Sequence, residues 1–216
     1  MRLPRVDGLI VLACGGAGAP PGLAHVDLPA RPDDDAVGEV LADHDPARVV
    51  VAGGDADLAA VVRHLLRTER LDVEVGYLAA GRGSDAAAAW GLPTKAAAAV
   101  KVAVQGRAER VPLIRDDSGG VLVGRGELRD VEGEAYCDTT LVLRGRAWQL
   151  MATPGTEGVS VAVRSGWAQP TRRATGRALQ IGCEPNTVVL DGVQHPQPVK
   201  RWTWYRHTAD LLLVRP

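Results

Sequence analysis

Two short glycine-rich stretches carry the residues best suited to chemistry in this chain. Residues 53–55 (Gly-Gly-Asp) directly follow an apolar run at 48–52, and residues 81–85 (Gly-Arg-Gly-Ser-Asp) follow a second apolar run at 73–79. Glycines let the backbone approach a ligand closely, and a helix that begins just afterwards offers free N–H groups suited to phosphate. Each stretch therefore has the chemistry of a phosphate-binding loop.

The polar residues of the two stretches suggest individual roles. Asp55 is placed to hold a cation or a ribose hydroxyl, and Arg82 is a candidate clamp for a phosphate group. Asp57 is expected to cap the first following helix, and Ser84 or Asp85 the second. A tight turn between a strand and a helix also uses glycine, and for residues 53–55 alone that structural interpretation is slightly favoured. The recurrence of the pattern at residues 81–85 shifts the balance toward one shared ligand site.

The elements that position these stretches form an alternating pattern. Strands are expected at 6–13, 48–52 and 73–79, and helices at 33–42, 58–70, 86–90 and 96–104. This alternation predicts βαβ units with a mostly parallel sheet, whose ligands bind beyond the carboxyl ends of the strands. Both stretches are therefore expected to face one crevice. A third glycine-rich stretch at 15–18 lacks the dinucleotide fingerprint because Pro21 replaces its third glycine, which disfavours a plain Rossmann dehydrogenase.

The sequence changes character after residue 105. Short β-branched runs, for example at 110–114 and 159–163, alternate with clusters of Gly, Pro and Asp. That pattern predicts antiparallel strands joined by turns. We therefore expect an α/β domain over residues 1–105 and an antiparallel β domain over residues 106–216.

Composition narrows the classes of protein further. The 216 residues include 25 Lys and Arg against 26 Asp and Glu, and this net charge of −1 argues against nucleic acid as a partner. No apolar run approaches the roughly 18 residues of a membrane-spanning helix. The three cysteines, at 14, 137 and 183, form no Cys-x-x-Cys pair, which favours a reduced, cytoplasmic location. The positive charge rests almost entirely on arginine, which suggests a GC-rich bacterial genome.

Three segments resemble one known family in the order in which they occur. VVVAGGDADLAAVV at 49–62 resembles the strand–GGDGT–helix signature of the diacylglycerol kinase catalytic domain and of related lipid, sphingosine and NAD kinases. YLAAGRGSDAAAAWGLP at 77–93 resembles their GTxNDxAxxLGxP loop. VVLDGVQHPQPV at 188–199, followed by DLLLVRP at 210–216, resembles their closing DGE turn and last strand. The resemblance implies a nucleotide-binding α/β domain followed by a β-sandwich.

The resemblance also implies a function, namely transfer of phosphate from ATP to a lipid at the membrane surface or to another hydroxyl acceptor. It implies as well that acidic residues organise Mg²⁺. Diacylglycerol, a sphingoid base, a polyprenol and NAD all agree with the motifs. Asp55 and Asp191 are the implied catalytic residues, and Asp55 and Asp85 the implied metal ligands. The positions that match the family's nucleotide-binding loops are Gly53, Gly54, Asp55, Gly81, Gly83 and Asp85. With Arg82 and Ser84 of the second stretch added, they form the predicted nucleotide-binding set.

Several positions depart from the motifs, among them Arg82 and Ser84, which replace the threonine and asparagine of the second loop. Ala56 and Asp57 stand where GGDGT has glycine and threonine, so Asp57 puts a negative charge near the expected triphosphate. Val193 replaces the glutamate that would help to deprotonate the acceptor hydroxyl. These departures keep two alternatives open. One is a degenerate relative that binds a nucleotide or phosphorylated metabolite without catalysis, and the other is an interaction module that forms a homodimer through exposed sheet edges.

Overall fold

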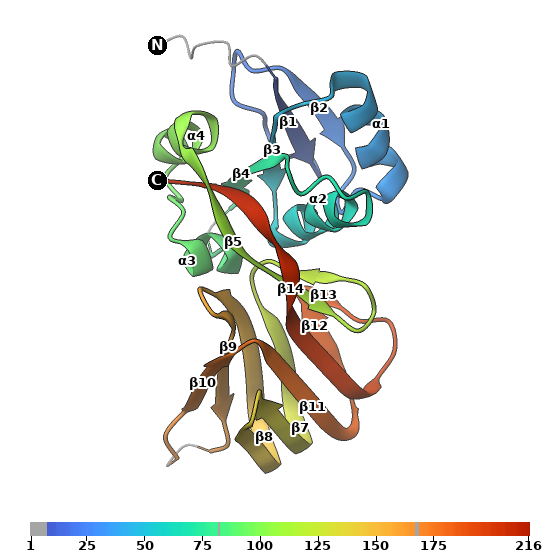
Figure 1. Ribbon diagram of the computed structural model, residues 1–216, viewed down its shortest axis with the longest axis vertical. Helices are drawn as coiled ribbons and strands as arrows, with labels where there is room; N and C mark the ends of the chain where they lie inside the picture. The colour runs from blue at the N-terminus through green and yellow to red at the C-terminus, as the bar shows by residue number, and fades with distance from the viewer. Residues whose placement is uncertain (1–7, 82, 167–168) are drawn as a thin grey trace. The chain divides into compact units, whose positions relative to one another are not determined.

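The computed structural model describes residues 8–81, 83–166 and 169–216 (Figure 1). It divides into two compact units, of which unit 1 comprises Met1–Val111 with Ala209–Pro216 and unit 2 comprises Pro112–Thr208. The predicted domains were continuous segments that met between residues 105 and 106. The units differ from them because the end of the last strand returns to unit 1, where Leu213 pairs with Val75.

Unit 1 is built on a parallel sheet, as predicted. Its strands run in the order β2-β1-β3-β4, and their bounds are β1 (Leu9–Cys14), β2 (His25–Leu28), β3 (Arg48–Gly53) and β4 (Glu74–Ala79). Adjacent strands pair in parallel, and the end of β14 (Val199–Arg215) joins beside β4. β1 and β3 are almost wholly buried, which is typical of strands covered on both faces.

Helices accompany this sheet at the predicted places. They are α1 (Asp34–His44), α2 (Asp55–Arg67), α3 (Asp85–Trp90) and α4 (Ala96–Gln105). α1 packs on α2, α2 packs on β3, and α4 packs on β4. α2 begins three residues before the predicted start at 58, so residues 55–57 belong to its first turn and not to a loop. No helix in the described part of the chain is long and apolar enough to cross a membrane.

Unit 2 consists of antiparallel strands, which confirms the class predicted for the second half. Its main sheet has the order β10-β9-β8-β7-β11-β14. β5, which runs from unit 1 into unit 2, pairs with β6. The bounds are β5 (Arg107–Asp116), β6 (Val121–Leu122), β7 (Gly126–Cys137), β8 (Thr140–Gly155), β9 (Gly158–Arg164), β10 (Arg172–Gly176), β11 (Ala178–Asn186), β12 (Val188–Leu190) and β13 (Val193–Gln194). The core of unit 2 gathers around Trp202 and Trp204, which pack edge to face with ring centroids 6.1 Å apart.

Candidate functional site

The two glycine-rich stretches lie side by side at the carboxyl edge of the parallel sheet. Gly53 ends β3 and pairs with Ala79, which ends β4. The amide of Ala80 donates a hydrogen bond of 2.7 Å to the carbonyl of Gly53, so the chain leaves both strands at one place. The predicted juxtaposition of the stretches is therefore present in the fold.

The Asp55 carboxylate joins the two stretches. Its Oδ1 accepts hydrogen bonds from the Ser84 hydroxyl at 2.5 Å and from the Tyr77 hydroxyl at 2.8 Å. Its Oδ2 accepts from the backbone amides of Asp85 at 2.8 Å and Ala86 at 3.2 Å. Asp55 lies at the start of α2, yet it satisfies the first amides of α3. Both of its oxygens are therefore engaged with the protein, and the side chain holds the start of α3 beside the start of α2.

Ser84 caps α3, one of the two caps that the sequence predicted for this helix. Its hydroxyl oxygen accepts from the amide of Ala87 at 2.9 Å while the hydroxyl donates to Asp55. Asp85 is the first residue of α3 and is half-buried. The opening amides of α3, from residues 85 to 87, are thus all satisfied by side chains of the protein itself.

Tyr77 is a site residue that the sequence patterns did not single out. It is a buried residue of β4, and its hydroxyl lies 3.2 Å from the carbonyl of Gly53 as well as 2.8 Å from Asp55. Burial and the negative charge of Asp55 raise the pKa of Tyr77 well above its ordinary value of 10.0. The hydroxyl therefore stays protonated and remains a donor. The available signal was that Tyr77 is the one aromatic residue of β4, directly before the second glycine-rich stretch.

Asp57 caps its own helix from within the first turn, although it was predicted to precede the helix. Its Oδ2 accepts from the amide of Gly54 at 2.7 Å, and its Oδ1 accepts from the amide of Arg31 at 2.6 Å. A Cβ on Gly53 would lie 2.5 Å from Asp57 Oδ2, so the glycine makes room for this contact. Burial, with a further contribution from Asp57, raises the pKa of the Cys14 thiol to about 12.

Backbone groups at the edge of the sheet remain available for an anion. The amides of Asp55 and Ala56 lie in the first turn of α2, where a helix has no acceptor of its own for them. Gly81 and Gly83 have φ values of +86° and +91°, and a Cβ at either position would meet nothing within 4 Å. Arg82, the predicted phosphate clamp between them, lies outside the described residues.

Among its described residues, the site holds no ready-made metal centre. In the described ranges, no group of three His, Cys, Asp or Glu side chains is placed to hold a metal ion. Asp55 does not fit the predicted role of Mg²⁺ ligand in this arrangement, because each of its oxygens already accepts two hydrogen bonds. Asp85 stays a predicted ligand.

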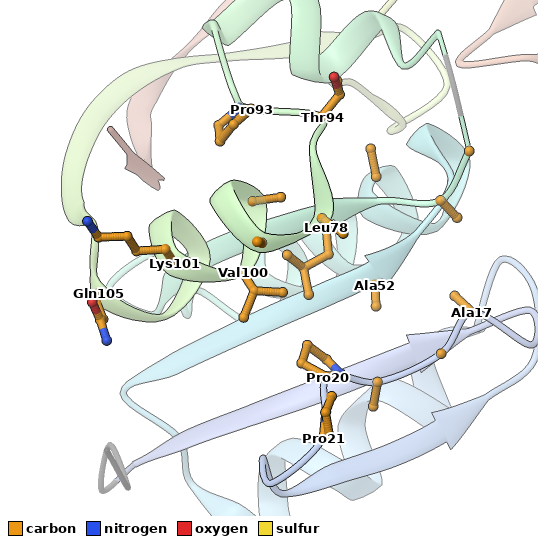
Figure 2. Close-up of a pocket in the computed structure, with 18 residues that line it drawn as sticks. Ala17, Pro20, Pro21, Ala52, Leu78, Pro93, Thr94, Val100, Lys101 and Gln105 are labelled. Atoms are coloured by element: carbon orange, nitrogen blue, oxygen red, sulfur yellow. The ribbon is translucent and has the colours of Figure 1, made fainter. Parts of the chain in front are cut away.

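An apolar pocket of about 810 Å³ opens next to the glycine-rich stretches (Figure 2). Its floor is formed by Ala52 and Leu78 at the ends of β3 and β4, and its walls by residues 17–21 and by one side of α4. Gly81 belongs both to this pocket and to the second glycine-rich stretch. Its volume lies within the usual range for ligand pockets, about 300–1,000 Å³. No pattern in the sequence predicted this pocket.

Asp191, the second predicted catalytic residue, belongs to unit 2. Its carboxylate accepts hydrogen bonds from the amides of Gly124 at 2.7 Å, Arg125 at 2.9 Å and Val123 at 3.1 Å. The residue is buried and has a φ of +48°, in the left-handed region. Asp191 thus fixes the turn between β12 and β13 onto residues 123–125. Val193 begins β13 just beyond it.

Comparisons with known proteins agree with this arrangement. Residues 25–115, which include both glycine-rich stretches, match the diacylglycerol kinase catalytic domain. No match was found among the curated proteins. The resemblance found in the sequence is thereby confirmed over the matched residues.

Solved structures share the fold of the whole chain. A putative diacylglycerol kinase from Bacillus anthracis superimposes with a TM-score of 0.75 at 12% identity, covering 100% of this chain and 98% of its own. An NAD kinase from Archaeoglobus fulgidus, solved with ATP, superimposes with a TM-score of 0.60 at 11% identity, and the match covers 96% of this chain and 93% of that one. Yeast NADH kinase, solved with NADH, superimposes with a TM-score of 0.53 at 12% identity, and the match covers 91% of this chain and 67% of that one. The protein therefore has the fold of diacylglycerol and NAD kinases.

Proposed function

We propose that this protein is an ATP-dependent kinase of the diacylglycerol kinase type, which transfers phosphate to a hydroxyl group of a lipid or similar acceptor. The observation that carries the proposal is the Asp55 carboxylate, which binds Ser84 and the amides of Asp85 and Ala86. It fixes the two glycine-rich stretches to each other at the carboxyl edge of the sheet. The same residues lie within the segment that matches the diacylglycerol kinase catalytic domain.

Phosphate binding at this edge has a direct physical basis. The amides of Asp55 and Ala56 point out of the first turn of α2, a helix of 13 residues whose dipole favours negative charge at its start. Gly81 and Gly83 lack side chains on the facing loop, so a phosphate group can approach the backbone there. We assign the phosphates of ATP to this space, with Arg82 as the proposed neutralising charge.

Positioning is the role we assign to Asp55. Phosphoryl transfer depends mainly on holding the reacting groups in place and neutralising charge, so a residue that fixes two phosphate-binding loops contributes without touching the metal. Mg²⁺ is proposed to arrive with ATP and to be held by phosphate oxygens, water and one or two carboxylates, as is usual for this ion. Asp85 stays the candidate metal ligand, and Asp191 stays the candidate catalytic residue on the side of the acceptor. We propose further that the enzyme is cytoplasmic and binds its lipid at the membrane surface.

The test combines nucleotide binding with turnover. Thermal unfolding is measured with ATP in the presence and absence of Mg²⁺, and transfer of labelled phosphate is measured with diacylglycerol in mixed micelles and with NAD. We expect ATP to raise the melting temperature and a phosphorylated lipid to accumulate. Asp55→Asn should reduce both effects, whereas Asp43→Asn, at an exposed position of α1, should leave them unchanged. Absence of any nucleotide-dependent stabilisation would refute the proposal.

A second candidate function is binding of a nucleotide or phosphorylated metabolite without transfer. The buried negative charge of Asp57, bonded to the amide of Gly54, favours it because that charge repels a triphosphate. The aliphatic Val193 favours it also, since it cannot remove a proton from an acceptor. Stabilisation by a nucleotide with no phosphorylated product from any acceptor would select this function over the kinase.

A further inference from the structure

The connection between β1 and β2 leaves one face of the parallel sheet thinly covered. Parallel strands are normally joined by a right-handed crossover that contains a helix. In the strand order β2-β1-β3-β4, the chain moves one way across the sheet from β1 to β2 and the other way from β2 to β3 and from β3 to β4. Right-handed crossovers in opposite directions lie on opposite faces of a sheet. The β1–β2 crossover is therefore on the face away from α1 and α2. Residues 15–24 make this crossover without any helix. They lie on the face of α4, because Ala17, Ala19 and Leu23 pack into the same core as Val104.

The apolar pocket occupies the space that this short crossover does not fill. Its residues come from the crossover on one side and from α4 on the other, with Ala52 and Leu78 between them (Figure 2). The facing part of α4 carries Ala96, Ala97 and Ala99, whose side chains are single methyl groups. Small side chains on α4 and a missing crossover helix together account for a volume of about 810 Å³.

The lining of the pocket is aliphatic throughout its interior. Alanine, proline, leucine and valine side chains line it, and neither an aromatic nor an acidic side chain is among the lining residues that the structure describes. A nucleobase is normally recognised by stacking on an aromatic ring and by well-placed polar groups. The described lining offers no aromatic ring for stacking, and its polar side chains are confined to Thr94, Lys101 and Gln105. An aliphatic chain needs only apolar surface that excludes water.

Two of the three polar side chains that line the described pocket, Lys101 and Gln105, lie at one end of it. Figure 2 shows Lys101 and Gln105 together at one end, far from Ala17 at the other. Lys101 is exposed, and its ammonium forms no ion pair within the ranges that the structure describes. An unpaired cation at the mouth of an apolar pocket is complementary to a ligand with an aliphatic body and an anionic head.

We propose that the apolar pocket binds a single acyl chain whose anionic head lies beside Lys101. A fatty acid and a lysophospholipid share this chemistry and differ in whether the head is a carboxylate or a phosphate. The site goes beyond the proposed kinase function, because it uses residues other than the phosphate-binding amides and is filled in the absence of ATP.

The experiment measures binding of a fluorescent fatty acid, 11-(dansylamino)undecanoic acid, to the full chain without nucleotide. Palmitate, lysophosphatidate and ATP are then tested as competitors. We expect palmitate or lysophosphatidate to displace the probe, and whichever displaces it at lower concentration identifies the head group. Displacement by ATP with no displacement by either lipid would overturn the proposal in favour of a nucleobase.

Matched variants localise the binding. Ala97→Trp fills the pocket and should weaken probe binding by about tenfold or more, whereas Ala98→Trp, exposed on the same helix outside the pocket, should not. Thr94→Trp at the rim provides a second obstruction if Ala97→Trp fails to fold. Lys101→Ala should weaken binding up to about fivefold and Lys95→Ala not at all. Unchanged binding in the two pocket-filling variants would overturn the proposal.

The two proposals fail in different ways. Loss of the kinase function would appear as absence of any ATP-dependent stabilisation, with probe binding intact. Failure of the acyl site would appear as absence of specific probe binding, with ATP-dependent stabilisation intact. Self-association of the chain that Ala97→Trp abolishes would show that a second copy fills the pocket, and it too would overturn the acyl-chain proposal.

Discussion

The carboxylate of Asp55 accepts a hydrogen bond of 2.5 Å from the hydroxyl of Ser84, which lies 29 residues further along the chain. Through this contact the acidic residue of one glycine-rich stretch holds the cap of the helix that follows the other. The same carboxylate also binds the amides of Asp85 and Ala86. The geometry of the candidate site therefore depends on one side chain that bridges two strand ends.

Removal of this bridge is expected to destabilise the protein. Asp55→Ala leaves the Tyr77 hydroxyl and two amides of α3 without their acceptor, and we expect the free energy of unfolding to fall by about 3 kcal/mol. Asp55→Asn keeps one carbonyl acceptor and should cost roughly half as much. Urea unfolding measures both values. Asp43→Ala is the control, with an expected change within about 0.5 kcal/mol, and an equally small effect of Asp55→Ala would contradict the bridging role.

The charge of Asp57 is expected to weaken nucleotide binding. Asp57→Asn keeps a carbonyl oxygen for the amide of Gly54 or Arg31 and removes the negative charge. If the phosphates lie at the start of α2, affinity for ATP should rise by roughly fivefold, which corresponds to about 1 kcal/mol of repulsion in high dielectric. Isothermal titration calorimetry provides the measurement. An unchanged affinity would place the phosphates away from this helix.

Asp191 is expected to contribute to stability through the residues 123–125 that it binds. Asp191→Ala removes the acceptor of three amides and places alanine at a φ of +48°, so we expect a loss of about 3 kcal/mol. Asp191→Asn should cost less, since asparagine tolerates that backbone and retains an acceptor. Activity lost in Asp191→Asn while the melting temperature is nearly unchanged would reveal a catalytic role in addition.

Gly126 is expected to tolerate no side chain. A Cβ at this position would overlap the indole ring of Trp204, which is fully buried in the core of unit 2. Gly126→Ala should therefore lower the free energy of unfolding by about 2 kcal/mol through overpacking. Gly182→Ala serves as the control in the same unit, because its Cβ would meet nothing within 4 Å and its φ is not positive. Equal effects of the two changes would contradict this packing.

Stability is expected to fall at alkaline pH because of Cys14. Its thiol stays protonated in the folded protein up to a pKa of about 12, whereas in the unfolded chain it loses its proton near 9.0. Between these values the folded state holds the extra proton, so the free energy of unfolding decreases as pH rises. Cys14→Ala should make the decline between about pH 9 and pH 10 shallower, by up to about 1.4 kcal/mol per pH unit. Urea unfolding at several pH values checks this, and an unchanged slope would exclude a buried thiol at this position.

The sequence by itself determined the local elements of unit 1. Two patterns that involve only residues near in sequence predicted these elements: the apolar runs of β3 and β4, and the 3.6-residue spacing of apolar residues in α2. The glycines at the strand ends mark where the chain leaves the sheet. The strand β2 was missed because His25–Leu28 lies at the edge of the sheet, where its residues alternate between exposed and half-buried and carry little apolar signal. β7 was missed because charged residues occupy its exposed positions.

The tertiary structure alone decided which groups meet. The partners of Asp55 at residues 84–86, and the contact of Asp57 with Arg31, depend on strand register and helix placement that no local pattern records. No local pattern records that the end of β14 returns to unit 1. No local pattern records the apolar pocket either, which exists because residues 15–24 form no helix and lie beside the alanines of α4. Periodicity is a short-range property of the chain, whereas the partners of a carboxylate and the volume of a pocket are set by packing between distant segments.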